Sequence, residues 1–117
     1  MKQNVRDIAP FEIVNGYHAR MIHSDNLTLA YVQVEAGAPL PEHRHIHEQI
    51  TSLLEGRFEL TVGGEVLTLE AGDVVVIPSN VPHSGRALTD CRLMDVFNPV
   101  REDFKNRDVA YGNKATR

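Results

Sequence analysis

The sequence predicts an all-β domain, either a sandwich or a barrel. Turn-forming residues recur at short intervals, the segments between them are rich in β-branched and aromatic residues, and no long amphipathic helical pattern interrupts them. The chain has 117 residues, which is enough for one hydrophobic core but not for two. We therefore expect a single domain over residues 1–117, with its core at about residues 27–100.

The expected strands alternate along the chain with glycine and asparagine turns. The clearest pair flanks Gly63-Gly64, because alternating apolar residues run up to this pair and resume after it, a strong signal for a two-residue hairpin. The segment Arg101–Arg117 is polar and mixed in charge, so we expect a short helix or a mobile tail there. The expected strands are Leu27–Glu35, Ile50–Leu54, Arg57–Val62, Glu65–Glu70, Val74–Ile77 and Arg92–Phe97.

Composition excludes several classes of function. The formal net charge is −4 and the basic residues are scattered, which argues against a nucleic-acid partner. The single cysteine, Cys91, excludes an intrachain disulfide. No stretch of about 18 apolar residues occurs, and the first residues lack the apolar segment of a secretory signal. We therefore expect a soluble, cytoplasmic protein without a membrane partner.

A cluster of potential metal ligands lies between His43 and Gln49, with His45 and His47 between them. On a strand, alternate side chains share a face, so these four side chains would lie on one side of a sheet. Imidazoles and an amide oxygen are costly to bury without a partner, and a divalent cation is the simplest partner. His83, which follows a proline-rich turn, is a further candidate.

The spacing of these residues resembles the two sequence motifs of the cupin family. The resemblance implies a jelly-roll barrel, the cupin double-stranded β-helix, which holds one divalent metal ion. It implies that the ligands are His43, His45, Gln49 and His83. The residues that match the first motif are Gly37, His43, His45, Gln49 and Gly56, and those that match the second are Gly72, Pro78, Asn80 and His83.

The match departs from the commonest cupin pattern at Gln49, which stands where most members have glutamate. Without an anionic ligand the metal would keep its full charge toward a substrate, which favours Lewis-acid chemistry. Glu48 is the rival ligand, although strand alternation places it on the opposite face, and His47 would be one imidazole more than usual. His18 and His23 lie far upstream, and we expect ordinary polar positions there. The ligand types fit Zn, Ni, Fe, Co or Mn without selecting one.

A carboxylate, Asp95, interrupts the last apolar strand and needs a physical reason. One explanation is a buried ion pair with Arg101 that fixes the C-terminal segment. The other is that Asp95 is a general acid and base, that Arg101 holds a substrate carboxylate through two parallel hydrogen bonds, and that Phe97 forms an apolar wall against a ring.

The segments 43–49 and 95–104 also resemble one cupin subgroup, the KdgF-type proteins of pectin and alginate degradation, which linearise unsaturated uronates. In that subgroup an Asp, a Phe and an Arg are implicated in catalysis, and they match Asp95, Phe97 and Arg101. The resemblance implies a metal-dependent enzyme that opens 4,5-unsaturated uronates, acts on a carboxylated sugar and forms a homodimer. The alternatives are a non-catalytic cupin that binds a sugar acid and a metal-dependent dioxygenase. Such dioxygenases usually keep the glutamate that Gln49 replaces.

Overall fold

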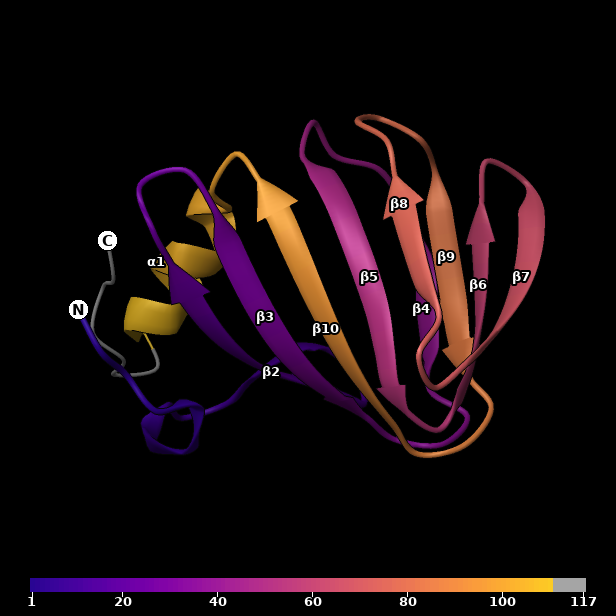
Figure 1. The fold of residues 1–117 in the computed structure, drawn as a ribbon, viewed down its shortest axis with the longest axis horizontal. Helices are drawn as coiled ribbons and strands as arrows, with labels where there is room; N and C mark the ends of the chain where they lie inside the picture. The colour runs from indigo at the N-terminus through magenta and orange to yellow at the C-terminus, as the bar shows by residue number, and fades with distance from the viewer. Residues whose placement is uncertain (111–117) are drawn as a thin grey trace.

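The computed structural model describes residues 1–110, which form two antiparallel sheets and a C-terminal helix (Figure 1). The larger sheet has the strand order β1-β2-β3-β10-β5-β8, and the smaller has the order β4-β9-β6-β7. In chain order the elements are η1 (Val5–Asp7), β1 (Phe11–Val14), β2 (Tyr17–His23), β3 (Thr28–Val34), β4 (Pro39–His43), β5 (Glu48–Glu55), β6 (Arg57–Val62), β7 (Glu65–Glu70), β8 (Val74–Ile77), β9 (His83–Ala87), β10 (Cys91–Asn98) and α1 (Glu102–Ala110).

This architecture confirms the all-β jelly-roll prediction, and every expected strand is present. The structure adds four strands that the sequence did not predict, namely β1, β2, β4 and β9. Because Phe11, Tyr17 and Met21 belong to the hydrophobic core, the core begins well before residue 27. The expected C-terminal helix is α1, and the rest of the expected tail, residues 111–117, lies outside the described residues.

The hairpin between β6 and β7 forms at the predicted glycine pair. Val62 pairs with Glu65, so the loop contains Gly63 and Gly64 alone. Their φ angles are 55° and 84°, in the left-handed region that a type I′ turn requires and that glycine adopts without a Cβ penalty.

The inner face of the larger sheet becomes polar toward one end. Leu93, Asp95 and Phe97 of β10 alternate inward, as the sequence predicts. Strand register extends this alternation sideways into rows that cross several strands. The last inward row consists of Ile77, Gln49, Phe97, Thr28 and His23, and the row before it consists of Val75, Thr51, Asp95, Ala30 and Met21.

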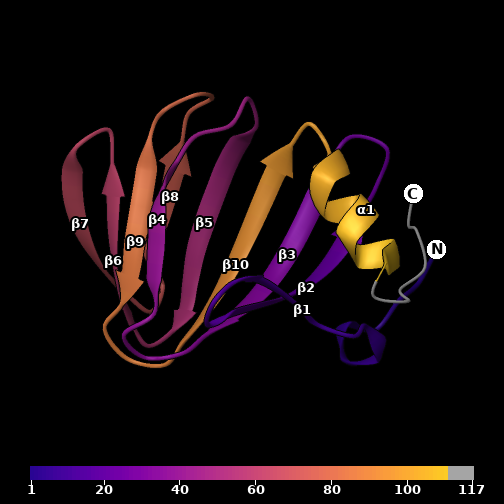
Figure 2. The same ribbon diagram turned by 180° about the vertical axis from the view of Figure 1, so that it is seen from behind.

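Helix α1 lies on the same side of the larger sheet as the smaller sheet does, over β2 and β3 (Figure 2). Its buried Phe104 packs against Phe97 and Phe11, with ring centroids 6.0 and 6.2 Å apart. The helix therefore covers the part of the inner face that the smaller sheet leaves open. Within residues 1–110, no helix is long and apolar enough to cross a membrane.

Candidate metal centre and adjoining cavity

The segment from His43 to Gln49 is not one continuous strand, so the sequence argument from strand alternation was wrong here. Strand β4 of the smaller sheet ends at His43, and β5 of the larger sheet begins at Glu48. Residues 44–47 carry the chain from one sheet to the other. The connection nevertheless brings His45 beside Gln49, because the His45 Nε2 and Gln49 Oε1 atoms lie 3.1 Å apart.

Three of the predicted ligands converge. One nitrogen from each of His43, His45 and His83 lies within 4.8 Å of the other two. His43 and His83 are paired across β4 and β9, and their ring centroids are 4.2 Å apart. His45 comes from the loop, and His83 is almost fully buried at 2% exposure.

Each of these imidazoles is oriented by a backbone carbonyl. The Nδ1 atoms of His43, His45 and His83 lie 2.8, 3.0 and 2.9 Å from carbonyl oxygens. A carbonyl oxygen only accepts, so Nδ1–H donates and the lone pair of each neutral ring stays on Nε2. Hydrogen bonds of this kind fix the tautomer and orientation of metal-binding histidines. The carbonyls belong to Pro41, His47 and Val81 in that order.

The remaining imidazole nitrogens fit a divalent cation. Nε2 of His83 is buried and has no hydrogen-bond partner among the described residues, which is rare for a buried polar atom. Burial, followed by the charges of Arg101 and His83, lowers the pKa of His45 to about 4, so this ring is neutral at pH 7. With its proton on Nδ1, His45 directs the Nε2 lone pair at Gln49 Oε1, an arrangement that a cation between the two atoms would stabilise.

The Gln49 amide is oriented by a chain of hydrogen bonds. Its Nε2 donates to Thr51 Oγ1 over 2.9 Å, and the Thr51 hydroxyl donates to Asp95 Oδ1 over 2.7 Å. The amide oxygen therefore faces the histidines, as a fourth ligand would. Glu48 is exposed, and neither it nor His47 belongs to the three-histidine cluster.

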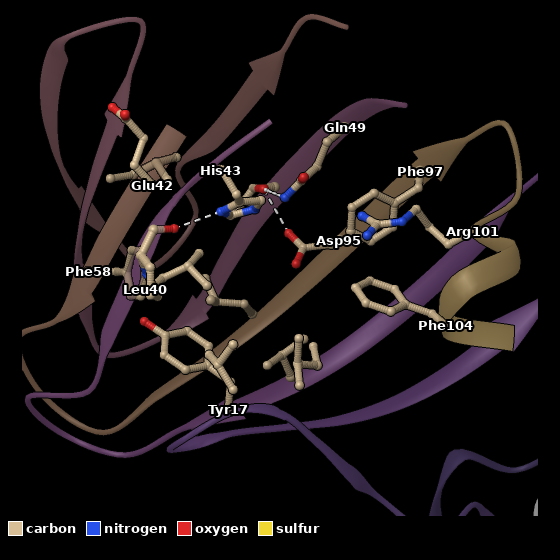
Figure 3. Close-up of a pocket in the computed structure, with 17 residues that line it drawn as sticks. Tyr17, Leu40, Glu42, His43, Gln49, Phe58, Asp95, Phe97, Arg101 and Phe104 are labelled. Carbon is tan, nitrogen blue, oxygen red and sulfur yellow. Dashed lines mark hydrogen bonds between the residues drawn. The ribbon is translucent and has the colours of Figure 1, made fainter. Parts of the chain in front are cut away.

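A cavity of about 290 Å³ adjoins the cluster (Figure 3). Its volume lies near the lower end of the range for small-molecule sites. The wall is mostly apolar, with a few polar side chains directed inward. The lining residues are Ile13, Val14, Tyr17, Val32, Leu40, Pro41, Glu42, His43, Gln49, Thr51, Phe58, Leu60, Leu93, Asp95, Phe97, Arg101 and Phe104.

Asp95 lies in this cavity, and no cationic side chain of residues 1–110 forms an ion pair with it. Burial raises its pKa to about 6, against the hydrogen bonds from Thr51 and Gln49 and the charge of Arg101, which lower it. The ion pairs of residues 1–110 do not include one between Asp95 and Arg101, so the alternative of a buried structural pair was wrong. A carboxyl group with a pKa near neutrality can both accept and donate a proton.

Arg101 pairs with Asp103 instead. Its Nε and Nη2 atoms donate to the two Asp103 carboxylate oxygens over 3.1 and 2.9 Å. Its guanidinium carbon lies 3.9 Å from the ring centroid of Phe104 and 4.8 Å from that of Phe97 (Figure 3). The prediction was that Arg101 holds a substrate carboxylate through two parallel hydrogen bonds. The Nε and Nη2 atoms instead make such a pair of bonds with Asp103, whereas Nη1 makes no hydrogen bond with the described residues.

Sequence reasoning missed three residues of the site: Thr51, Asp103 and Phe104. Thr51 could have been found, since it lies two positions after Gln49 on a strand and shares its face. Phe104 lies three positions after Arg101, a helical spacing that brings both side chains to one face. The Asp103 contact depends on where α1 begins, and sequence patterns locate helix boundaries poorly.

The chain is similar in sequence to a known protein family and to a curated relative. A family model described as "Cupin domain" matches residues 30–97, more than half of the chain. The pectin degradation protein KdgF of Dickeya dadantii is 34% identical over 86% of this chain and 94% of its own length.

Two solved structures are also similar. An RmlC-like cupin from Shewanella frigidimarina superposes with a TM-score of 0.83 at 30% identity, over 87% of this chain and 93% of the other. KdgF from a Halomonas species superposes with a TM-score of 0.77 at 31% identity, over 81% of this chain and 91% of the other. On the match of the family model and on these relatives, the chain belongs to the cupin family.

Proposed function

We propose that this cupin is a metal-dependent enzyme that opens 4,5-unsaturated uronates and converts them to linear keto acids in the breakdown of pectin or alginate. The observation that carries the proposal is a cluster of three oriented histidines beside a partly buried carboxylate, Asp95, which lines a cavity of about 290 Å³. Similarity to the pectin degradation protein KdgF of Dickeya dadantii supports the substrate class. A divalent ion held by His43, His45, His83 and Gln49 would supply Lewis acidity toward a sugar oxygen.

The reaction moves one proton from the anomeric hydroxyl of the sugar to its C4 atom. Ionised Asp95 accepts the proton of the anomeric hydroxyl while the bond between the anomeric carbon and the ring oxygen breaks, which leaves an aldehyde and an enolate. Protonated Asp95 then delivers that proton to C4, and the C5 oxygen becomes a ketone. Atoms and charge balance without a further reactant. A pKa of about 6 lets one carboxyl group perform both transfers.

Two other residues orient the sugar. Nη1 of Arg101 binds the uronate carboxylate. The hydrogen bonds to Asp103 and the contacts with two aromatic rings hold the guanidinium in the orientation that this binding needs. The Phe97 ring forms an apolar wall against the sugar, and the apolar lining around it excludes water from the site.

The test is the loss of ultraviolet absorbance by the conjugated double bond of a 4,5-unsaturated uronate, measured above its spontaneous rate. We expect metal-loaded protein to accelerate this loss and the Asp95→Asn variant to bind metal without acceleration. Asn keeps an oxygen that accepts from Thr51, so the variant removes the proton-transfer group with little change in shape. Equal rates for the wild type and Asp95→Asn would refute the proposed role of Asp95.

The second candidate is a cupin that binds a carboxylated sugar without turnover. It rests on the same cavity and on Arg101. Wild-type protein that binds metal and a uronate but leaves the double bond intact would favour this candidate. Oxygen consumption with a flavonol or diketone would favour a metal-dependent dioxygenase, for which no feature of the site gives separate support.

The homodimer remains a prediction. We propose that a second copy of the chain packs on the outer face of the larger sheet. Strand register places a row of five apolar side chains across β2, β3, β10, β5 and β8. Val76 and Ile50 in this row are 55% and 39% exposed. Exposed apolar side chains gathered on one sheet face are typical of protein interfaces, and Val74 in the next row on this face is also exposed. The row consists of Ile22, Leu29, Val96, Ile50 and Val76.

A further inference from the structure

A buried polar network lies beside the cavity, outside the residues assigned so far. His23, expected from sequence to be an ordinary polar position, is 1% exposed, and Thr28 and Asp108 are 0% and 3% exposed. His23 and Thr28 are the closing pair of the β2–β3 hairpin, and Asp108 lies near the end of α1. Polar groups buried this deeply are costly unless they bond to one another.

The network forms a directional chain of hydrogen bonds that ends on Arg101. The Arg101 backbone N–H donates to Thr28 Oγ1 over 2.9 Å. Thr28 Oγ1 lies 2.8 Å from His23 Nδ1, and His23 Nε2 lies 3.2 Å from Asp108 Oδ2. Every hydrogen in this chain meets an acceptor when Thr28 donates to Nδ1 and His23 donates from Nε2 to Asp108 Oδ2.

Helix α1 depends on such anchors because it has little apolar surface to bury. Phe104 is its only buried apolar side chain. Arg101 precedes the helix, and its carbonyl accepts the first helical hydrogen bond, from the Lys105 N–H. Thr28 therefore fixes the start of α1 and His23 fixes its end, while Arg107 adds a third attachment to the Glu12 carbonyl of β1.

We propose that Thr28, His23 and Asp108 are positioning residues for the binding of the substrate carboxylate. By fixing both ends of α1, they place the Arg101 guanidinium and the Phe104 ring at the cavity wall. None of the three lines the cavity, so their effect reaches the substrate only through Arg101 and Phe104. The inference rests on the proposed function to the extent that Arg101 receives a uronate carboxylate.

A matched pair at Thr28 tests the inference. Thr28→Val removes the hydroxyl at nearly constant volume, and Thr28→Ser keeps it. With galacturonate as the probe, titrated into metal-loaded protein by calorimetry, we expect Thr28→Val to bind about tenfold more weakly and Thr28→Ser to bind like the wild type. In turnover of an unsaturated uronate, the same change should raise KM with little effect on kcat. Equal affinity in Thr28→Val and Thr28→Ser would overturn the inference.

A second pair and a double-mutant cycle separate positioning from general damage to the fold. Asp108→Ala should weaken galacturonate binding and Asp108→Asn should restore part of it, while Glu102→Gln, at an exposed acid on the same helix, should have no effect. In an Arg101→Gln background, Thr28→Val should cause a much smaller loss than in the wild type, because only its effect through Phe104 remains. An additive loss in that background would show that Thr28 does not act through Arg101.

Amide hydrogen exchange tests the Thr28 network separately from the proposed enzyme activity. The Arg101 backbone amide should be protected in the wild type and should exchange at least about tenfold faster in Thr28→Val, with smaller changes at the core amides of β10. Unchanged protection would refute the network even if galacturonate does not bind. A wild type that binds galacturonate but leaves the unsaturated uronate intact would instead refute the enzyme proposal and leave the network standing.

Discussion

The raised pKa of Asp95 predicts that its ionised carboxylate destabilises the folded protein. Its pKa is raised from 3.8 to about 6, so the folded protein binds the Asp95 proton more tightly than the unfolded chain does. Protonation therefore stabilises the folded state. The resulting stability is fully present below the unfolded pKa and is lost as the pH rises through the folded pKa. At about 1.4 kcal/mol per pKa unit, the complete loss is about 3 kcal/mol.

The Asp95→Asn variant isolates this contribution, because Asn does not titrate and still accepts the hydrogen bond from Thr51. The free energy of unfolding of Asp95→Asn minus that of the wild type should increase by about 2 kcal/mol between about pH 4.5 and pH 8, the part of the loss that develops in this range. The measurement is urea unfolding of chelator-treated protein at several pH values, because a bound cation would change the charge beside Asp95.

The control is Asp25→Asn, which removes the same charge at an exposed turn. Its difference from the wild type, measured at the same pH values, gives the effect of removing an exposed charge. If the Asp95→Asn difference is independent of pH, burial does not raise the pKa of Asp95, and the assignment of one carboxyl group to both proton transfers loses its basis.

The site and the larger sheet support four further predictions. His83→Ala should abolish metal binding, measured as metal per chain after dialysis, because it removes the most deeply buried nitrogen. Asp103→Asn should tighten galacturonate binding a few-fold in calorimetry, since a neutral amide competes less strongly for the Arg101 guanidinium. Val76→Asp should convert a dimer to a monomer in light scattering by placing a charge in the apolar row. Gln49→Glu should bind metal more tightly and turn over more slowly at neutral pH, as equilibrium dialysis and the pH–rate profile would show.

Most strands were predictable because one face of each meets the core and alternates cleanly. Strand β4 was hidden by Pro39 and Pro41, which indicate a turn; they are tolerated here because β4 lies at the edge of its sheet. Strand β9 contains Gly85, where a Cβ would lie 2.5 Å from the Phe58 ring. Glycine at this position allows the ring to approach the backbone closely, but it removes the alternation by which the strand would be recognised.

The candidate ligands were predictable from motif spacing, although the strand geometry assumed for them was wrong. His43 and His45 converge through a change of sheet, which spacing within one strand does not describe. The partner of Arg101 was not predictable in the same way. Asp95 and Asp103 both lie near it in sequence, and only the start of α1 decides which carboxylate the guanidinium meets.

The hydrogen bonds between the histidines and Asp95 explain why residue 49 is glutamine and not glutamate. A glutamine amide can present an oxygen to the histidine side and an N–H to Thr51, which leaves the Thr51 hydroxyl hydrogen for Asp95. An ionised glutamate at this position would have no N–H, so the single Thr51 hydrogen would have to serve either that glutamate or Asp95. A second carboxylate so close would also raise the pKa of Asp95 above 6 and reduce the fraction that can act as a base at neutral pH. Glutamine at this position gives up an anionic ligand, and in exchange the neighbouring carboxyl group can both accept and donate a proton near pH 7.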